Sequence, residues 1–300
     1  MRFAVPVNDA AEIPALAAAG ADELYCGYQD AEWQARYGSH DSASRRQGRA
    51  NLSAPEDLRA VADAARTYGL PVHLTLNGRV SAPQLPDLLR IAALWADCGG
   101  QGVILRDPGL LMLLRERFDF RYTASLLTVT VNPEGAAFWR DLGVQRLVLP
   151  RFLCPEEIAA VTAGAPELEY EAMVMGDRCP FVDGFCRSVH AVGYEPAPPG
   201  AEATAVRETC NPTGGAFHLC MDYCVPVPDP CAACRLDALE RSGVSVGKLG
   251  GRGLPLELRL RWLTFLRAAE ALGDPEERQK LYRQTFQHEC NCYFAKRGGA

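Results

Sequence analysis

The sequence predicts an α/β fold, a (β/α) TIM-like barrel with a Cys-rich irregular segment and C-terminal helices. Three observations support this prediction. Over the first 175 residues, short β-branched apolar segments alternate with amphipathic stretches of helical period, the pattern of repeated β/α units. No Gly-x-Gly-x-x-Gly motif follows the first expected strand, which disfavours the dinucleotide-binding open sheet. From residue 176 onward the periodicity ends, and Pro, Gly and Cys dominate as far as residue 230.

Seven strands are expected in the periodic part, each placed to within a few residues. They cover 3–7, 23–26, 72–77, 102–106, 121–125, 146–149 and 169–175. Two of the intervening helices have clear starts: Ser53 with Glu56 predicts an N-cap, and Pro155 follows Cys154 in the first turn of another helix. Two further helices are expected at 256–271 and 276–287.

These elements divide the chain into three parts. Residues 1–175 form the main part of the barrel, 176–254 a Cys-rich segment that completes it, and 255–300 a helical tail. Because (β/α) barrels build their sites at the carboxyl ends of the strands, polar residues that follow strands are candidates for substrate binding. We assign this role to Asn77, Ser125, Arg151 and Arg252, the two arginines as partners for carboxylates.

Composition limits the class of protein. A net charge of -6 gives no basic field for phosphate backbones, so nucleic acid is not expected as a partner. The small basic cluster at 45–49 fits a solvated loop, or part of a lid over the barrel mouth spanning 33–49. Neither an export signal nor a membrane-spanning run of about 18 apolar residues is found, so a cytoplasmic location is expected.

The twelve cysteines are distributed unevenly. Seven of them lie between 179 and 234, and thiols gathered like this in a reducing compartment usually bind metal or do redox chemistry. Only Cys231-x2-Cys234 has the form of a zinc knuckle, and the mixed spacings favour an iron-sulfur cluster. Whether the Cys290-x-Cys292 pair near the C-terminus adds a ligand stays open. The remaining three are expected to be packing residues: Cys26, Cys98 and Cys154.

Several segments resemble peptidase family U32, the collagenase-like group, in its short single-barrel form. The family signature runs from a Glu to a pair of cysteines seven apart, and here it resembles Glu171 through Cys179 with Cys186. A Cys-x3-Cys pair resembles Cys220 and Cys224, and a later block resembles 231–252, with Lys248 to Arg252 on a strand. The resemblance also includes 19–27 and 149–158, so that it covers about residues 1–255.

The resemblance implies a function as well as a fold. Family members include reported peptidases and oxygen-independent hydroxylation proteins with a [4Fe-4S] cluster, which act in ubiquinone synthesis or on RNA bases, with prephenate as oxygen donor for some. Carried over to this chain, it implies the cluster ligands Cys179, Cys186, Cys220 and Cys231. The alternates are Cys210, Cys224 and Cys234. Glu171 and His218 are the candidates for catalytic groups.

The chain departs from the family pattern at three positions. Met175 stands where the family has His, Met173 where it has Phe, and Gly250 where it has Glu. Losing a His and a Glu removes two groups that could transfer protons, which weakens any mechanism of acid-base hydrolysis.

We therefore expect an iron-sulfur enzyme that modifies a small molecule or biosynthetic intermediate, of carboxylate-bearing type, by oxygen-independent hydroxylation. One alternative is a peptidase, although neither Gly-x-Ser-x-Gly nor His-Glu-x-x-His is found. The other is a non-catalytic cluster-bearing subunit. A heterodimer with a related protein is a further expectation from the family.

Overall fold

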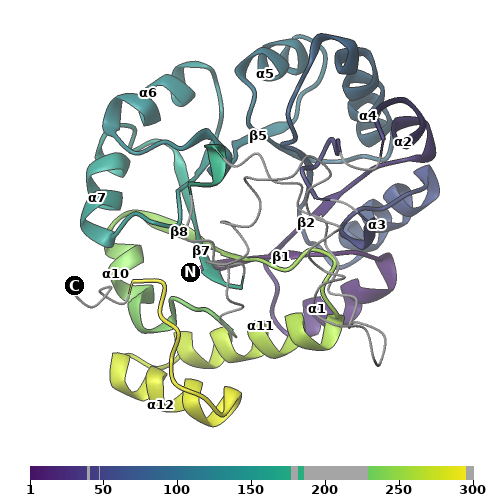
Figure 1. Ribbon diagram of the computed structural model, residues 1–300. Coiled ribbons are helices and arrows are strands. Elements are labelled where there is room, and N and C mark those ends of the chain that lie inside the picture. The colour runs from purple at the N-terminus through teal and green to yellow at the C-terminus, as the bar shows by residue number, and fades with distance from the viewer. Residues whose placement is uncertain (39–40, 47, 177–181, 186–228, 295–300) are drawn as a thin grey trace, which may run out of the picture.

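The computed structural model describes residues 1–38, 41–46, 48–176, 182–185 and 229–294. Eight parallel strands form a closed barrel in which each strand pairs with its neighbours in sequence, and β8 pairs with β1. Figure 1 shows the strands around the centre and the helices outside them. The strands are β1 Arg2–Pro6, β2 Glu23–Gly27, β3 Val72–Leu76, β4 Gly102–Leu105, β5 Arg121–Ala124, β6 Arg146–Val148, β7 Glu169–Met175 and β8 Val244–Leu249.

Helices connect successive strands along the outside of the barrel. They are α1 Ile13–Ala18, α2 Ala31–Tyr37, α3 Pro55–Thr67, α4 Leu85–Asp97, α5 Pro108–Arg115, α6 Pro133–Asp141, α7 Pro155–Ala163 and α10 Leu236–Arg241. After β8 come α11 Leu256–Glu270, which packs on the barrel, and α12 Pro275–Phe286, which packs on α11 (Figure 1). No helix in the described ranges is long and apolar enough to cross a membrane.

The predicted TIM-like barrel is confirmed, and the seven expected strands agree with the structure to within one residue at each end. The predicted helix starts are right in one case and wrong in the other. Cys154 is the N-cap of α7, but the N-cap of α3 is Ala54 rather than Ser53. The Asp57 carboxylate accepts the Ala54 N–H at 3.1 Å, so the acid that closes this turn is one residue later than predicted.

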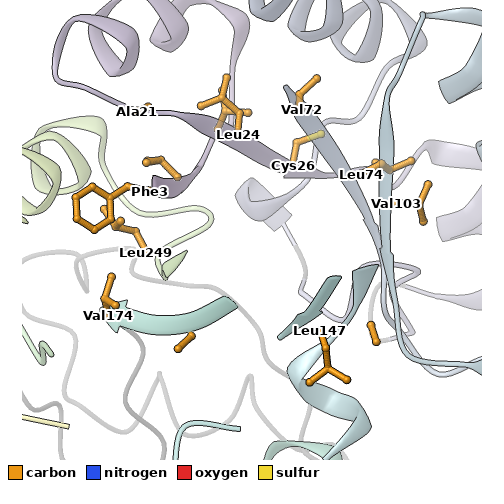
Figure 2. Packing of buried hydrophobic residues seen from close by; sticks show 14 of the residues in the cluster. Phe3, Ala21, Leu24, Cys26, Val72, Leu74, Val103, Leu147, Val174 and Leu249 are labelled. Atoms are coloured by element: carbon orange, nitrogen blue, oxygen red, sulfur yellow. The ribbon is translucent and has the colours of Figure 1, made fainter. Parts of the chain in front are cut away.

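Side chains alternate between the two faces of each strand, as the pleat requires. The apolar ones face the helices and form the core, where Leu24, Leu74, Val103 and Val174 are fully buried. Figure 2 shows them with Cys26, a packing residue as predicted. Cys98 is likewise buried, whereas Cys154 is partly exposed at its helix start.

The inward-facing set differs from the branched apolar layers that usually fill such barrels. It includes the buried polar residues Glu23, His73, Thr75, Thr123, Arg146, Glu171 and Lys248. The interior of this barrel is therefore lined in large part by charged groups, and these lead up to its carboxyl end.

Candidate active site at the barrel mouth

A cavity of about 80 Å³ opens at the carboxyl ends of the strands. Its walls come from residues on or just after seven of the strands, together with the loop after α2 and the segment at 182–185. The lining residues are Tyr25, Arg45, Arg46, Thr75, Asn77, Ile104, Ser125, Leu126, Leu127, Val148, Arg151, Met173, Asp183, Lys248, Gly250 and Arg252. The four residues predicted to bind substrate are thus brought into one cavity.

The described lining carries five cationic side chains and one carboxylate, that of Asp183. Arg151 forms a two-point ion pair with this carboxylate, with Nε 3.0 Å from Oδ2 and Nη2 on Oδ1. Arg45 Nη1 donates to the Asp183 carbonyl at 3.1 Å. Cationic side chains thus outnumber carboxylates in the described part of the lining, a composition that suits an anionic ligand.

Arg252 is the most firmly positioned of these cations. It is 5% exposed, and its Nη1 donates to Thr75 Oγ1 and its Nη2 to the Ser44 carbonyl, both at 2.7 Å. Gly27 makes room for it, since a Cβ at that position would lie 2.2 Å from Arg252 Nη1. The guanidinium therefore joins β3 to the loop after α2 while remaining in the cavity wall.

Asn77 and Ser125 lie side by side in the cavity wall. Asn77 Nδ2 donates to Ser125 Oγ at 3.2 Å. The Asn77 Oδ1 atom is buried and has no hydrogen-bond donor among the described residues. Because a buried acceptor without a donor costs free energy, this amide oxygen is suited to receive a hydrogen bond from a ligand.

Lys248 forms the floor of the cavity, where it meets the barrel interior. Its Nζ lies 2.5 Å from Glu171 Oε1 and 4.0 Å from the centre of the Tyr25 ring. Burial lowers the pKa of Lys248, and the Glu171 carboxylate offsets this only in part. Burial also disfavours the ionised Glu171, but the charges of Lys248 and Arg146 outweigh it and hold the pKa of that carboxyl below its ordinary value.

The Lys248–Glu171 ion pair belongs to a larger network of charged side chains inside the barrel. Arg146 Nη1 lies 2.9 Å from Glu171 Oε2 and 2.7 Å from Glu23 Oε2, and His73 Nε2 lies 3.3 Å from the same Glu23 atom. Burial lowers the pKa of His73. Burial alone would raise the pKa of Glu23, but hydrogen bonds from His73 and Arg146 hold it well below its ordinary value. Glu171 is therefore a buried member of a salt-bridge network.

The two catalytic candidates are not equally placed. Glu171 lies beneath the cavity and reaches it through Lys248, so a catalytic role for it stays a prediction. His218 lies outside the described residues, as do Cys179, Cys186, Cys210, Cys220 and Cys224. The prediction missed Lys248, Arg45, Arg46 and Asp183 as cavity residues. Lys248 belongs to the block 231–252 that carries the family resemblance, and this block was the signal that pointed to it.

Cys231 is the one implied cluster ligand in the described ranges. It is fully buried and forms an isolated bridge with Met175, at the carboxyl end of β7. Cys179 follows Met175 by four positions in the sequence. The Cys231 thiol has the donor chemistry that an iron-sulfur cluster requires. As they stand, no three His, Cys, Asp or Glu side chains in the described ranges form a ready metal-binding group.

The fold and the cavity define a (β/α) barrel protein with a pocket at its carboxyl end whose described lining is rich in cationic side chains. Comparison of the sequence with known families identifies the family of the protein. The family model of peptidase family U32 matches residues 8–296, and the chain belongs to this family.

Two relatives carry names that refer to hydroxylation. The tRNA hydroxylation protein P of Escherichia coli (strain K12) is 29% identical over 168 residues, which are 56% of this chain and 34% of that protein. The tRNA hydroxylation protein P2 of Bacillus subtilis (strain 168) is 28% identical over 127 residues, 42% of this chain and 41% of that protein. The matched parts thus cover less than half of each relative.

Among solved structures, a dihydrodipicolinate synthase aligns with a TM-score of 0.51 over 95% of this chain and 80% of its own, at 7% identity. At this identity the likeness shows the barrel fold alone.

Proposed function

We propose that this protein is a cytoplasmic iron-sulfur enzyme of the oxygen-independent hydroxylation type, with a carboxylate-bearing small molecule bound at the barrel mouth. The observation that supports the proposal is the predominance of cationic side chains in the described lining of the cavity at the carboxyl end of the barrel. Relatives named as tRNA hydroxylation proteins support hydroxylation as the reaction class.

The arginines would bind and orient the anion. Arg252 is held by Thr75 and Ser44, so its guanidinium is preorganised and loses little freedom when it binds a carboxylate. Arg151 would exchange part of its pairing with Asp183 for the ligand. Lys248, paired with Glu171, would donate a hydrogen bond from the floor, and Asn77 Oδ1 would accept one from a hydroxyl of the ligand.

A [4Fe-4S] cluster would be held by cysteines of the 179–231 region, with Cys179, Cys186, Cys220 and Cys231 implied by the family. When bound, the cluster would supply redox or Lewis-acid chemistry. The chain's own groups have a separate task. They hold the anion in a fixed orientation, and the small cavity limits access of water to it.

Two classes of molecule are candidates for the substrate that receives the oxygen atom. A small molecule or biosynthetic intermediate agrees with the acidic balance of the chain. The names of the relatives make tRNA the second candidate. Phosphates of tRNA would pair with Arg46, which lines the cavity. They would also pair with Arg49, which lines a second cleft with Asn51 and Ser53.

A peptidase is less well supported by the cavity. Neither His nor Cys belongs to its described lining, and Ser125 accepts a hydrogen bond from Asn77 rather than pairing with a base. A nucleophile without a general base is not activated.

The test uses the full chain purified without oxygen. Iron and sulfide content establishes the cluster, and calorimetry with prephenate as the probe establishes the anion site. We expect Arg151→Gln to weaken prephenate binding at least tenfold, whereas Arg140→Gln, a change to a partly exposed arginine that pairs with Asp141 on the outer helix α6, leaves it unchanged. Mass spectrometry then detects the gain of one oxygen by tRNA nucleosides or by small-molecule candidates. A protein that holds no iron and binds no carboxylate would refute the proposal.

A further inference from the structure

One lysine, Lys248, belongs to the described lining of the cavity at the barrel mouth. It lies near the end of β8, and 9% of its side chain is exposed. Its Nζ lies 2.5 Å from Glu171 Oε1, whereas Glu171 is fully buried and does not line the cavity. Of the two groups in this ion pair, the amine is therefore the one that a ligand in the cavity contacts.

The barrel encloses the Lys248 amine on most sides. The centre of the Tyr25 ring lies 4.0 Å from Nζ, and Met173 is the partner of Lys248 on the neighbouring strand β7. Burial lowers the pKa of Lys248, and the Glu171 carboxylate offsets this only in part. Burial together with cationic neighbours is the setting that turns a lysine amine into a nucleophile, and the described lining adds four arginines to this lysine.

Glu171 can accept the ammonium proton without leaving Arg146 unpaired. Arg146 Nη1 lies 2.9 Å from Glu171 Oε2, but the same guanidinium also lies 2.7 Å from Glu23 and 2.5 Å from Glu169. These two carboxylates stay with Arg146 when Glu171 is protonated. An arginine at position 248 could form the same kind of ion pair but could not lose a proton. The lysine therefore gives the pair a chemistry that a purely structural role does not require.

The arginines of the cavity indicate the other half of the ligand. Arg252 Nη1 donates to Thr75 Oγ1 at 2.7 Å, and Arg252 shares the cavity lining with Arg151 and Lys248. A guanidinium binds a carboxylate through parallel hydrogen bonds, whereas a primary amine reacts with a carbonyl carbon. A molecule that carries the two groups on neighbouring carbons, a 2-oxo acid, uses both kinds of side chain at once.

We propose that Lys248 forms an imine with the carbonyl carbon of a 2-oxo acid, whose carboxylate is bound by the arginines of the cavity. This inference rests on the proposed function and narrows its ligand from any small carboxylate to a 2-oxo acid. It makes Lys248 a catalytic residue, because its Nζ bonds to the reacting carbon, and Glu171 the group that holds the proton which Nζ releases.

The reaction conserves charge and needs no oxidant or reductant. One proton of the Lys248 ammonium passes to Glu171 as the Nζ–C bond forms, and a second passes from Nζ to the former carbonyl oxygen. Glu171 then returns its proton, so that this oxygen leaves as water while the C=N bond forms. The product is a protonated imine, which keeps one positive charge opposite the Glu171 carboxylate.

The experiment traps the imine in the full chain. Pyruvate is the probe, and sodium cyanoborohydride reduces the C=N bond, which leaves a stable N-(1-carboxyethyl) group on the modified lysine. Peptide mass mapping locates this group. We expect Lys248 to be labelled at least about tenfold faster than Lys280, an exposed lysine on α12 that pairs with Glu277. Both lysines are compared within the wild-type chain, so the result does not depend on how a variant folds.

Two related compounds test the two halves of the ligand. Acetone has the carbonyl without the carboxylate, and lactate has the carboxylate without the carbonyl. Neither should label Lys248 efficiently, and lactate should slow the labelling by pyruvate because it occupies the arginines. Lys248→Arg keeps the positive charge beside Glu171 and should abolish labelling at this position, whereas Arg140→Gln on the outer helix α6 should leave labelling unchanged.

Three results would overturn the proposal: no labelling of Lys248, equal labelling of Lys248 and Lys280, or labelling by acetone as fast as by pyruvate. None of these readouts requires iron or hydroxylation activity. A protein that holds iron and binds prephenate but is not labelled at Lys248 would refute the imine alone. Labelling of Lys248 in a protein without iron would support the imine while the proposed hydroxylation fails.

Discussion

The buried pair of Glu171 and Lys248 gives a quantitative prediction for Glu171→Gln. The change keeps the shape of the side chain and removes its charge, so Lys248 and Arg146 lose a shared counter-ion inside the barrel. At 2.5 Å, the observed distance, and an effective dielectric constant of about 20, the attraction to Lys248 alone is roughly 6 to 7 kcal/mol. Desolvation of the two ions offsets several kcal/mol of this. We therefore expect the free energy of unfolding at pH 7 to fall by about 3–5 kcal/mol.

The assay is urea unfolding of the variant, of Lys248→Met and of the double variant. Removing both charges leaves less uncompensated charge than removing one, so the two losses should not add. The coupling energy should be at least about 2 kcal/mol. The matched control is Glu277 with Lys280, a pair at 2.6 Å that is about half exposed, for which the same cycle should give less than about 1 kcal/mol. Losses that add to within about 0.5 kcal/mol in the buried pair would refute the reasoning.

The same variant, Glu171→Gln, should also change how the free energy of unfolding depends on pH in the acid range. The pKa of Glu171 in the folded state lies below its ordinary value of 4.5, so the folded state resists protonation more than the unfolded state does. Its stabilising contribution is present above pH 4.5 and is lost as the pH falls toward the folded pKa. Glu171→Gln should therefore weaken the dependence of stability on pH in this range, by at most one proton, or about 1.4 kcal/mol per pH unit. If the free energy of unfolding of Glu171→Gln depended on pH as steeply as that of the wild type, the lowered pKa of Glu171 would be contradicted.

Two further changes test other parts of the site and fold. Gly27→Ala places a Cβ 2.2 Å from Arg252 Nη1, so prephenate binding should weaken at least tenfold by calorimetry, whereas Gly273→Ala, with open space around it, should leave binding unchanged. Asp229→Ala leaves the buried indole N–H of Trp262 without the acceptor it now has at 2.5 Å. The free energy of unfolding in urea should fall by about 1–3 kcal/mol, and Asp229→Asn should restore most of it; equal losses in both would exclude this hydrogen bond as the cause.

The amino-acid sequence by itself determined the strands and the end of the barrel at which the site lies. Both follow from local information: the alternation of apolar residues sets each strand, and parallel closure brings all carboxyl ends together. Asn77, Ser125, Arg151 and Arg252 could be assigned to one site for this reason, although their neighbours in it could not.

Only the tertiary structure decided which charges and which thiols meet. Lys248 pairs with Glu171 across 77 positions of sequence, and Arg146 with Glu23 across 123, because the register of neighbouring strands and barrel closure bring them together. The family resemblance implied Cys231 as a ligand together with cysteines that precede it, yet its sulfur neighbour in the described chain is Cys290, 59 positions later. Such contacts depend on how the chain returns after α11 and α12, and no local pattern encodes that path.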